Sequence, residues 1–299
     1  SEKNEVSILD PGCGLAILSC ALIEHLVEVS SPYRINLTLY ETDKKIIPFT
    51  LDVLYYLKAW CETRKVQIDY HLNETDFVLD RCECLDGADT IFGDMFGQER
   101  FDYVTSNPPY FKLAKDDIHT RSCASIVDGQ TNIYALFMAI CAKLLAEDGQ
   151  MIFITPRSFA SGRYFQSFRN FLFQHVSIEL IHLFNTRKDT FAKDEVLQEL
   201  VIMRMIPSGN GGRITVSYSQ GISDLDHPYQ KVYAASEIVD VSSEEKVVYL
   251  PVDRRDEAIL SLFRSWDGNM EKYGIKISTG PVVAFRAYDF IVNEPGDDT

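Results

Sequence analysis

The feature that most constrains the fold is a strand, a glycine turn and a helix at the start of the chain. An apolar strand pattern over Val6–Asp10 runs into Pro11-Gly12-Cys13-Gly14, and a helical pattern follows over Leu15–Val29. Glycines in such a turn let a ligand approach the main chain closely, and the start of the helix faces that ligand. The spacing is not G-x-G-x-x-G, so a dinucleotide is only weakly indicated. The unit predicts a nucleoside site at the carboxyl end of a strand.

Strand and helix patterns alternate along most of the chain. Strands are predicted at Val6–Asp10, Ile35–Glu41, Gln67–Leu72, Tyr103–Ser106, Met151–Thr155, Ile178–Phe184 and Leu200–Met205. Helices are predicted at Leu15–Val29, Lys44–Glu62, Ile133–Ala146 and Phe165–Phe173. This alternation predicts an α/β fold with a doubly wound, mostly parallel sheet of seven strands. The last two strands lack a helix between them and predict a hairpin, which adds an antiparallel strand at one side.

Strand and helix patterns are shorter and less regular in residues 207–299. The breaker cluster at 207–212 is the clearest domain boundary, so we expect a catalytic domain at 1–206 and a partial α+β region at 207–299. Short strands are predicted at Arg213–Ser219 and Lys246–Leu250, and a helix at Glu257–Trp266.

Two acidic residues follow apolar runs and have two interpretations each. Glu41 ends the second predicted strand, where a carboxylate accepts hydrogen bonds from both hydroxyls of a ribose. A solvated carboxylate at a strand end explains Glu41 equally well. Asp94 follows the short apolar run at 91–92 and fits either an acceptor for an adenine amino group or a turn cap.

The turn Asn107-Pro108-Pro109-Tyr110 follows another predicted strand and carries the clearest chemistry. The prolines fix two φ angles and remove two N–H donors, which leaves carbonyl oxygens free as acceptors. The Asn107 amide oxygen is a second acceptor, and Tyr110 offers an aromatic face. Acceptors that converge on an NH2 group suit a planar amine or amide substrate. The alternative is an ordinary Pro-Pro turn after a strand.

These pieces, in this order, resemble the S-adenosylmethionine-dependent amino-methyltransferases that act on DNA adenine. The resemblance implies that the motif around Asp10, Gly12 and Gly14 binds the methionine part of the cofactor. It also implies that Glu41 holds the ribose and Asp94 contacts the cofactor's adenine. Asn107, Pro108, Pro109 and Tyr110 then form the catalytic loop, with Asn107 also beside the cofactor.

The resemblance is strongest to gamma-ordered restriction–modification enzymes similar to the Eco57I type. It continues through Gly149–Pro156, Asn185–Phe191, Val196–Glu199 and, more weakly, Ser278–Arg286. It places Phe191 where that group has an aromatic residue that stacks on a flipped adenine, opposite Tyr110. Two departures stand out: Ala16 replaces a usual third glycine, and the segment that precedes the cofactor strand is short. We therefore expect a fragment of a longer enzyme, in which 207–299 begins a target-recognition region.

Net charge is −15, which is unusual for a protein that binds a polyanion. Positive charge is nevertheless concentrated between Arg157 and Lys193, where six basic residues accompany two acidic ones. We expect Arg157, Arg187, Lys188 and Lys193 to face the DNA backbone. Ordinary solvated arginines explain Arg163 and Arg169 nearly as well.

Composition bounds the remaining possibilities. The 299 residues, 46% of them hydrophobic, suffice for one large core and a small second unit. No apolar run spans a bilayer and no export leader is evident, so we expect a soluble protein of the bacterial cytoplasm. The seven cysteines have no paired C-x-x-C spacing, and the histidines no metal spacing. We expect free thiols and no metal.

The sequence thus predicts a site-specific DNA adenine-N6 methyltransferase that acts on a base flipped out of double-stranded DNA. A cognate restriction endonuclease or specificity element is an expected partner. A protein glutamine or RNA base methyltransferase with the same turn remains an alternative, as does a non-catalytic subunit that binds DNA or cofactor. Cytosine amino methylation is a near relative, although that group more often has Ser at the position of Asn107. The sequence does not predict the recognition site or the oligomeric state.

Overall fold

The computed structural model describes most of the chain in two units that are treated separately. The described residues are 3–30, 32–85, 99–127, 131–184, 200–209, 212–219, 221, 224–241, 243–251, 254–266, 268, 270 and 272–276. Residues 1–252 form one compact unit, and residues 253–299 form the other.

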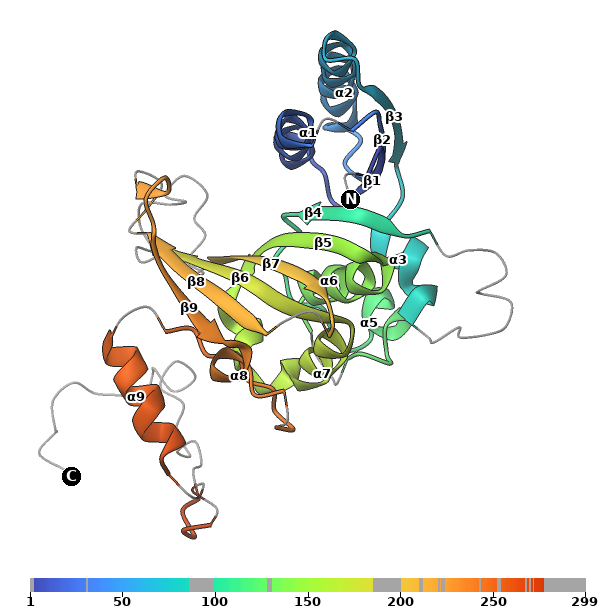
Figure 1. Cartoon of the computed structure of the whole chain (residues 1–299). Helices are drawn as coiled ribbons and strands as arrows, with labels where there is room; N and C mark the ends of the chain where they lie inside the picture. The colour runs from blue at the N-terminus through green and yellow to red at the C-terminus, as the bar shows by residue number, and fades with distance from the viewer. Residues whose placement is uncertain are drawn as a thin grey trace, which may run out of the picture. The chain divides into compact units, whose positions relative to one another are not determined.

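The first unit is built on a sheet of nine strands among the described residues (Figure 1). The strands are β1 (Glu5–Asp10), β2 (Arg34–Tyr40), β3 (Gln67–Asn73), β4 (Phe101–Ser106), β5 (Leu145–Pro156), β6 (Val176–Phe184), β7 (Leu200–Pro207), β8 (Arg213–Ser219) and β9 (Tyr229–Ala234). Their order in the sheet is β3-β2-β1-β4-β5-β7-β6-β8-β9. The chain moves outward from β1 to β3 and returns at β4, so the strand order reverses between β1 and β4.

The sheet is mostly parallel, as predicted, and an antiparallel strand, β9, lies at one edge. The β6–β7 hairpin is also confirmed, and β7 lies between β5 and β6, antiparallel to both. The number of strands is nine rather than seven, because β8 and β9 add to the free side of β6. The compact unit consequently continues to 252, whereas the breaker cluster predicted a boundary at 206. In the chain, that cluster lies between β7 and β8 of the same sheet.

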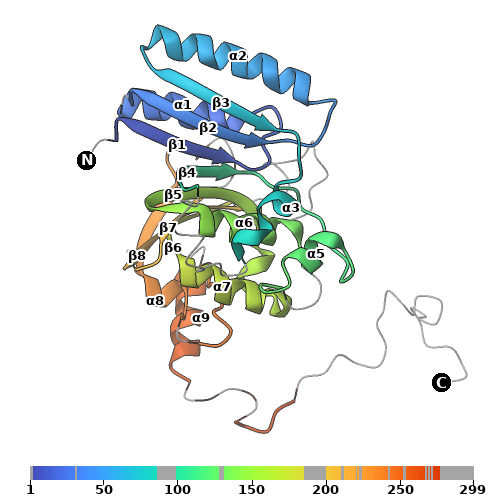
Figure 2. The ribbon, with the colours of Figure 1, turned by 90° about the vertical axis from the view of Figure 1, so that its right-hand side faces the viewer.

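Helices cover both faces of the sheet (Figure 2). The helices α1 (Ile17–Val29) and α2 (Ile47–Thr63) contribute Ile23, Leu26, Leu54 and Leu57 to one apolar cluster with β1, β2 and β3. The helices α6 (Ile133–Leu144) and α7 (Gln166–His175) pack in a second cluster on the strands from β4 onward. Alternate residues of β1 divide between the clusters, Ile8 in the first and Leu9 in the second.

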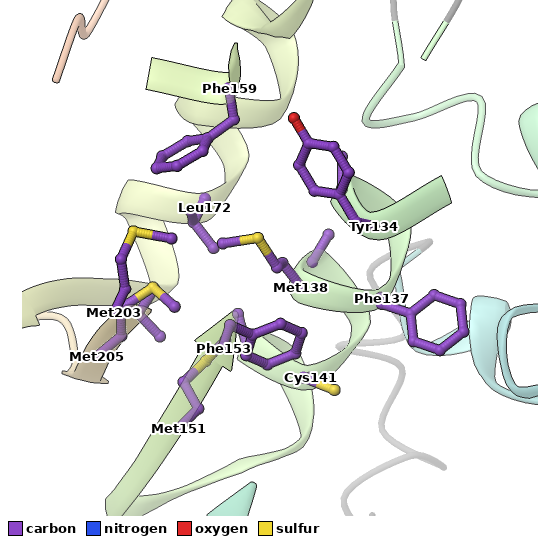
Figure 3. Close-up of a cluster of buried hydrophobic side chains, with 14 of the residues drawn as sticks. Tyr134, Phe137, Met138, Cys141, Met151, Phe153, Phe159, Leu172, Met203 and Met205 are labelled. Atoms are coloured by element: carbon purple, nitrogen blue, oxygen red, sulfur yellow. The ribbon is translucent and has the colours of Figure 1, made fainter. Parts of the chain in front are cut away.

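The second cluster surrounds α6 (Figure 3). All residues of α6 except Lys143 are buried, since the helix is apolar on every side. Figure 3 shows Met138 and Cys141 of α6 facing Phe153 and Met151 of β5. The strands from β4 onward therefore pack on a helix that is apolar on every side.

Short helices fill the connections, and one longer helix lies in the second unit. They are α3 (Phe77–Arg81), η1 (Cys82–Leu85), α5 (Ile118–Ser122), η2 (Arg157–Ala160), η3 (Arg163–Phe165), α8 (Ala235–Ile238) and, in the second unit, α9 (Arg254–Arg264). The strand predicted at Lys246–Leu250 is only an isolated bridge between Val239 and Val248. Within the described ranges, no helix is both long and apolar enough to cross a bilayer. All seven cysteines are free, as predicted.

Candidate active site

Three predicted site residues lie at one edge of the sheet. Asp10 ends β1, Glu41 follows β2, and Asn107 follows β4. These strands are neighbours in the order β2-β1-β4 and run parallel. The carboxyl ends of parallel strands meet at the same edge, and the strand order reverses there. Open α/β sheets bind ligands at such a point.

Glu41 is held by the glycine turn. Its Oε2 accepts a hydrogen bond from the Gly14 backbone N–H at 3.0 Å, and its Oε1 accepts one from the Asp43 N–H at 2.8 Å. The Thr50 hydroxyl of α2 donates to the Gly14 carbonyl oxygen at 2.6 Å. The half-buried carboxylate thus has a fixed orientation, and each oxygen keeps a lone pair for a further donor.

The turn requires left-handed backbone at two positions. Gly14 has φ +51°, and no heavy atom would lie within 4 Å of a Cβ added there. Ala16 has φ 58° and is fully buried at the start of α1. Alanine in this conformation costs about 1–2 kcal/mol that glycine avoids. The backbone therefore adopts the geometry of a third glycine, although the residue is alanine.

Asp10 is a buried carboxylate with one unused oxygen. The Ser19 hydroxyl of α1 donates to Oδ2 at 2.6 Å, whereas Oδ1 has no hydrogen-bond partner among the described residues. Burial raises the pKa of Asp10 to about 7. The bonds from Ser19 and the Gly12 amide act against that rise, and the charge of Glu41 adds to it. A buried acceptor without a partner among the described residues fits a cofactor that brings a hydrogen-bond donor.

The Asn107–Tyr110 turn is anchored through its tyrosine. The Tyr110 hydroxyl donates to the Ile154 carbonyl oxygen of β5 at 2.9 Å and also contacts Asn107 Oδ1. Burial raises the pKa of Tyr110 well above its usual range, so the phenol stays protonated. Asn107 is exposed and Pro108 is buried. The Asn107 oxygen therefore already has one contact and keeps a second lone pair for a substrate.

Several predicted site residues lie outside the described residues. These are Asp94, Arg187, Lys188, Phe191 and Lys193, together with the whole Ser278–Arg286 segment. Arg157 is exposed at the start of η2, directly after β5, and therefore at the same edge as Asn107.

Arg169 does not belong to an exposed basic face. It is fully buried on α7, and its guanidinium donates to the carbonyl oxygens of Phe159 at 3.0 Å, Gly162 at 2.8 Å and Glu245 at 2.8 Å. The expectation of a surface arginine is wrong for this residue, because Phe168 and Leu172 share its buried side of the helix.

The segment after the turn contains α5 and is held by contacts at Leu113 and His119. The Leu113 N–H donates to the Thr131 carbonyl oxygen at 2.8 Å. His119 lies between two carboxylates, with Nδ1 2.7 Å from Asp117 Oδ1 and Nε2 3.1 Å from Asp76 Oδ2. Asp76 and Asp117 are the N-cap residues of α3 and α5, so His119 joins the two helices.

Comparison with known proteins finds relatives along nearly the whole chain. It is 28% identical to the Type II methyltransferase M.BsuBI of Bacillus subtilis over 99% of this chain and 57% of that protein. It is 26% identical to the Type II methyltransferase M.PstI of Providencia stuartii over 96% of this chain and 55% of that protein. The chain thus spans little more than half the length of these relatives.

The fold is similar to a solved restriction–modification structure. The type IIG restriction endonuclease BpuSI aligns with a TM-score of 0.58 over 83% of this chain and 29% of its own, at 16% identity. The model of the Eco57I restriction-modification methylase family matches residues 34–191, which is more than half of the sequence. This chain therefore belongs to the Eco57I restriction-modification methylase family.

Proposed function

We propose that this chain is the catalytic part of a restriction–modification DNA methyltransferase that methylates the exocyclic N6 of adenine. The observation that carries the proposal is the position of the Asn107–Tyr110 turn, at the end of β4 and next to the Asp10–Gly14 turn at the end of β1. A site for an amino group thus adjoins a nucleoside site. Membership of the methylase family and the names of the relatives support a restriction–modification methyltransferase.

The methyl donor is S-adenosylmethionine, which when bound supplies an electrophilic methyl group on a sulfonium centre. Asp10, Gly12 and Gly14 hold its methionine part, with Asp10 Oδ1 as the free acceptor. The remaining lone pairs of Glu41 accept the ribose hydroxyls, in the orientation that the Gly14 and Asp43 amides fix. Asp94 contacts the adenine ring of the cofactor.

The catalytic turn aligns a weak nucleophile. The lone pair of adenine N6 is delocalised into the ring, so the amino group reacts only if it becomes pyramidal. Asn107 Oδ1 and the Pro108 carbonyl oxygen each accept one N6–H bond, and this leaves the lone pair directed at the methyl group. Methyl transfer in line needs no covalent intermediate, so positioning and electrostatics supply the rate.

The target adenine leaves the duplex to reach this turn. Tyr110 on one side and Phe191 on the other stack on the flipped base, and each stack contributes on the order of 1–3 kcal/mol. Arg157, Arg187, Lys188 and Lys193 contact the DNA backbone. Target recognition is assigned to the chain from 253 onward, and a cognate restriction endonuclease or specificity element is the proposed partner.

The Asn107→Ala variant tests this assignment. We expect methyl transfer to fall by about 100-fold or more, because a substrate acceptor is lost, while cofactor affinity stays nearly unchanged. The measurement is nucleoside mass spectrometry of genomic DNA from a methylation-free bacterial host that expresses the chain with its natural flanking sequence. Asn36→Ala is the control, since the Asn36 side chain bonds only Glu5 on the exposed surface.

The outcomes separate the alternatives. N6-methyladenine that appears with wild type and Asn36→Ala, and disappears with Asn107→Ala, supports the proposal. Unmodified DNA from a folded protein that binds S-adenosylmethionine moves the assignment to a protein glutamine or RNA base substrate. Loss of cofactor binding in Asn107→Ala, equal to the loss of activity, contradicts the role given to Asn107.

A further inference from the structure

An aromatic stack lies directly behind the catalytic turn. The ring of Tyr110 meets the ring of Tyr134 edge-to-face, with centroids 6.3 Å apart and an interplanar angle of 83°. Tyr134 in turn packs on Phe165 at 5.7 Å. Tyr134 is fully buried near the start of α6, and Figure 3 shows its hydroxyl pointing away from Phe153 and Cys141. Its ring therefore forms one wall of the Tyr110 site.

Tyr134 is joined to the same strand end as Tyr110. The Tyr134 hydroxyl lies 3.0 Å from the Ser158 hydroxyl, just after β5, and the Tyr110 hydroxyl bonds Ile154 within β5. The backbone adds a second connection, because the Ile133 N–H donates to the Phe111 carbonyl oxygen at 3.1 Å. The residues that follow Tyr110 and precede Tyr134 in the chain are thus paired with each other.

The η2–η3 segment, which contains the Tyr134 contacts Ser158 and Phe165, is held by Arg169. The buried Arg169 guanidinium bonds the carbonyl oxygens of Phe159 and Gly162, which lie on either side of the turn between η2 and η3. Its bond to the Glu245 carbonyl oxygen ties that turn to a distant part of the chain. Ser158 and Phe165, which both contact Tyr134, lie in or beside the η2–η3 segment that Arg169 holds in place.

We propose that Tyr134 is a positioning residue for methyl transfer, which sets the orientation of the Tyr110 ring and, through it, of the Asn107 acceptor. The inference rests on the proposed function, since it assigns Asn107 to the target amino group. Tyr110 touches Asn107 Oδ1 with its hydroxyl, so a tilt of its ring displaces that oxygen. Tyr134 touches neither Asp10 nor Glu41 in any described contact, and its effect is therefore confined to the substrate side.

The test compares Tyr134→Leu with Tyr134→Phe and with the control Leu172→Ala. Leu172 is fully buried on α7 in the same cluster, so its truncation also destabilises the core. For each variant, kcat and KM are measured with unmethylated genomic DNA, the cofactor Kd by calorimetry and the Tm by thermal unfolding. All assays run well below the lowest Tm.

We expect Tyr134→Leu to lower kcat by about 10- to 100-fold, with KM and cofactor Kd within about twofold of wild type. Tyr134→Phe keeps the ring against Tyr110 and should recover most of that loss. Leu172→Ala should lower Tm but leave kcat within about twofold. If Tyr134→Leu lowers kcat no more than Leu172→Ala, or weakens cofactor binding as strongly as it slows transfer, the inference is wrong.

Failure of the proposed function has a different signature. In that case wild type itself transfers no methyl group to DNA. The same variants are then compared on the glutamine peptide or RNA that wild type does modify. With that substrate we expect the same ratio of variant to wild-type kcat, because any planar amino group binds at the same Asn107–Tyr110 turn.

Discussion

Among the residues of the candidate site, Asp10 has a pKa far from its value in solution. A carboxylate with a pKa of about 7 is largely protonated in the ligand-free protein below neutral pH. The pKa of Asp10 is higher in the folded protein than in the unfolded chain, so protonation of Asp10 favours the folded state. This contribution to the free energy of unfolding is fully present below about pH 4. It is lost as the pH rises towards 7, where Asp10 becomes a buried charge that forms no ion pair with any described residue.

Cofactor binding should therefore depend on pH. S-adenosylmethionine carries a sulfonium and an ammonium group, and these favour the ionised form of Asp10. We expect the affinity to rise with pH up to about 7, by at most about tenfold per unit, and then to level off. Calorimetry between pH 6 and pH 8 measures it, with Asp10→Asn as the variant in which the dependence should disappear. Equal affinities at both ends of that range would contradict the role of Asp10.

Sequence patterns located some site residues and not others for a physical reason. Asp10, Glu41 and Asn107 could be proposed from the sequence because each lies at or directly after the end of a strand, and strand ends follow from local periodicity. Ser19 and Thr50 were missed, because only the packing of α1 and α2 brings their hydroxyls to Asp10 and Gly14. The buried position of Arg169 could have been predicted, because Phe165 lies four residues before it and Leu172 three residues after it, on the buried face of the helix.

At the scale of elements, His119 joins α3 and α5 through the two carboxylates that cap these helices. Burial lowers the pKa of His119, but the hydrogen bonds to Asp117 and Asp76 outweigh it, and the pKa is raised overall. The same contact lowers the pKa of Asp117. The charge of Arg121 also lowers the pKa of Asp117, as a smaller cause than His119. The segment after the Asn107–Tyr110 turn is thus joined to α3 through the His119–Asp76 pair, and the charge of His119 depends on pH.

This tie should weaken in mildly alkaline solution. Because the pKa of His119 is raised in the folded protein, protonated His119 adds to the free energy of unfolding. That contribution is fully present below the unfolded pKa of about 6.5 and is lost as the pH rises through the folded pKa. We expect His119→Gln to lower the free energy of unfolding by roughly 0.5–1 kcal/mol at pH 6 and by less at pH 8.5, since the site is partly exposed. Urea unfolding of both proteins at the two pH values measures the difference. A constant difference across that range would contradict the ion pair.

At the scale of the whole molecule, the strands after the breaker cluster belong to the sheet rather than to a second domain. Ile214 and Val216 of β8 are buried, and Ser217 and Ser219 bond the two ring nitrogens of buried His182 on β6 at 2.9 and 3.1 Å. The sequence could not show this, because turn residues between two strands and linker residues between two domains have the same composition. Only the pairing of β6 with β8 distinguishes them.

Truncation should distinguish the two boundaries. A chain that ends at Val252 keeps the whole sheet, and we expect it to be soluble and to unfold cooperatively. A chain that ends at Pro207 loses β8 and β9, exposes the edge of β6 and leaves His182 without its partners. We expect it to aggregate. Solubility after expression and thermal unfolding are measured for both truncated chains. A stable, monomeric 1–207 chain would favour the boundary at 206 that the sequence predicts.

The reversal of strand order between β1 and β4 also has an evolutionary consequence. Every fully buried member of the first apolar cluster comes from residues 6–68, so the half of the sheet assigned to the cofactor is one continuous piece of the gene. The catalytic turn and the strands around it form the next piece, and the two are joined side by side along β1 and β4. A single recombination event between the codons for β3 and β4 exchanges one half intact. Descendants of such an exchange inherit one methyl-donor module and acquire a new catalytic one, provided that the surface between β1 and β4 still matches.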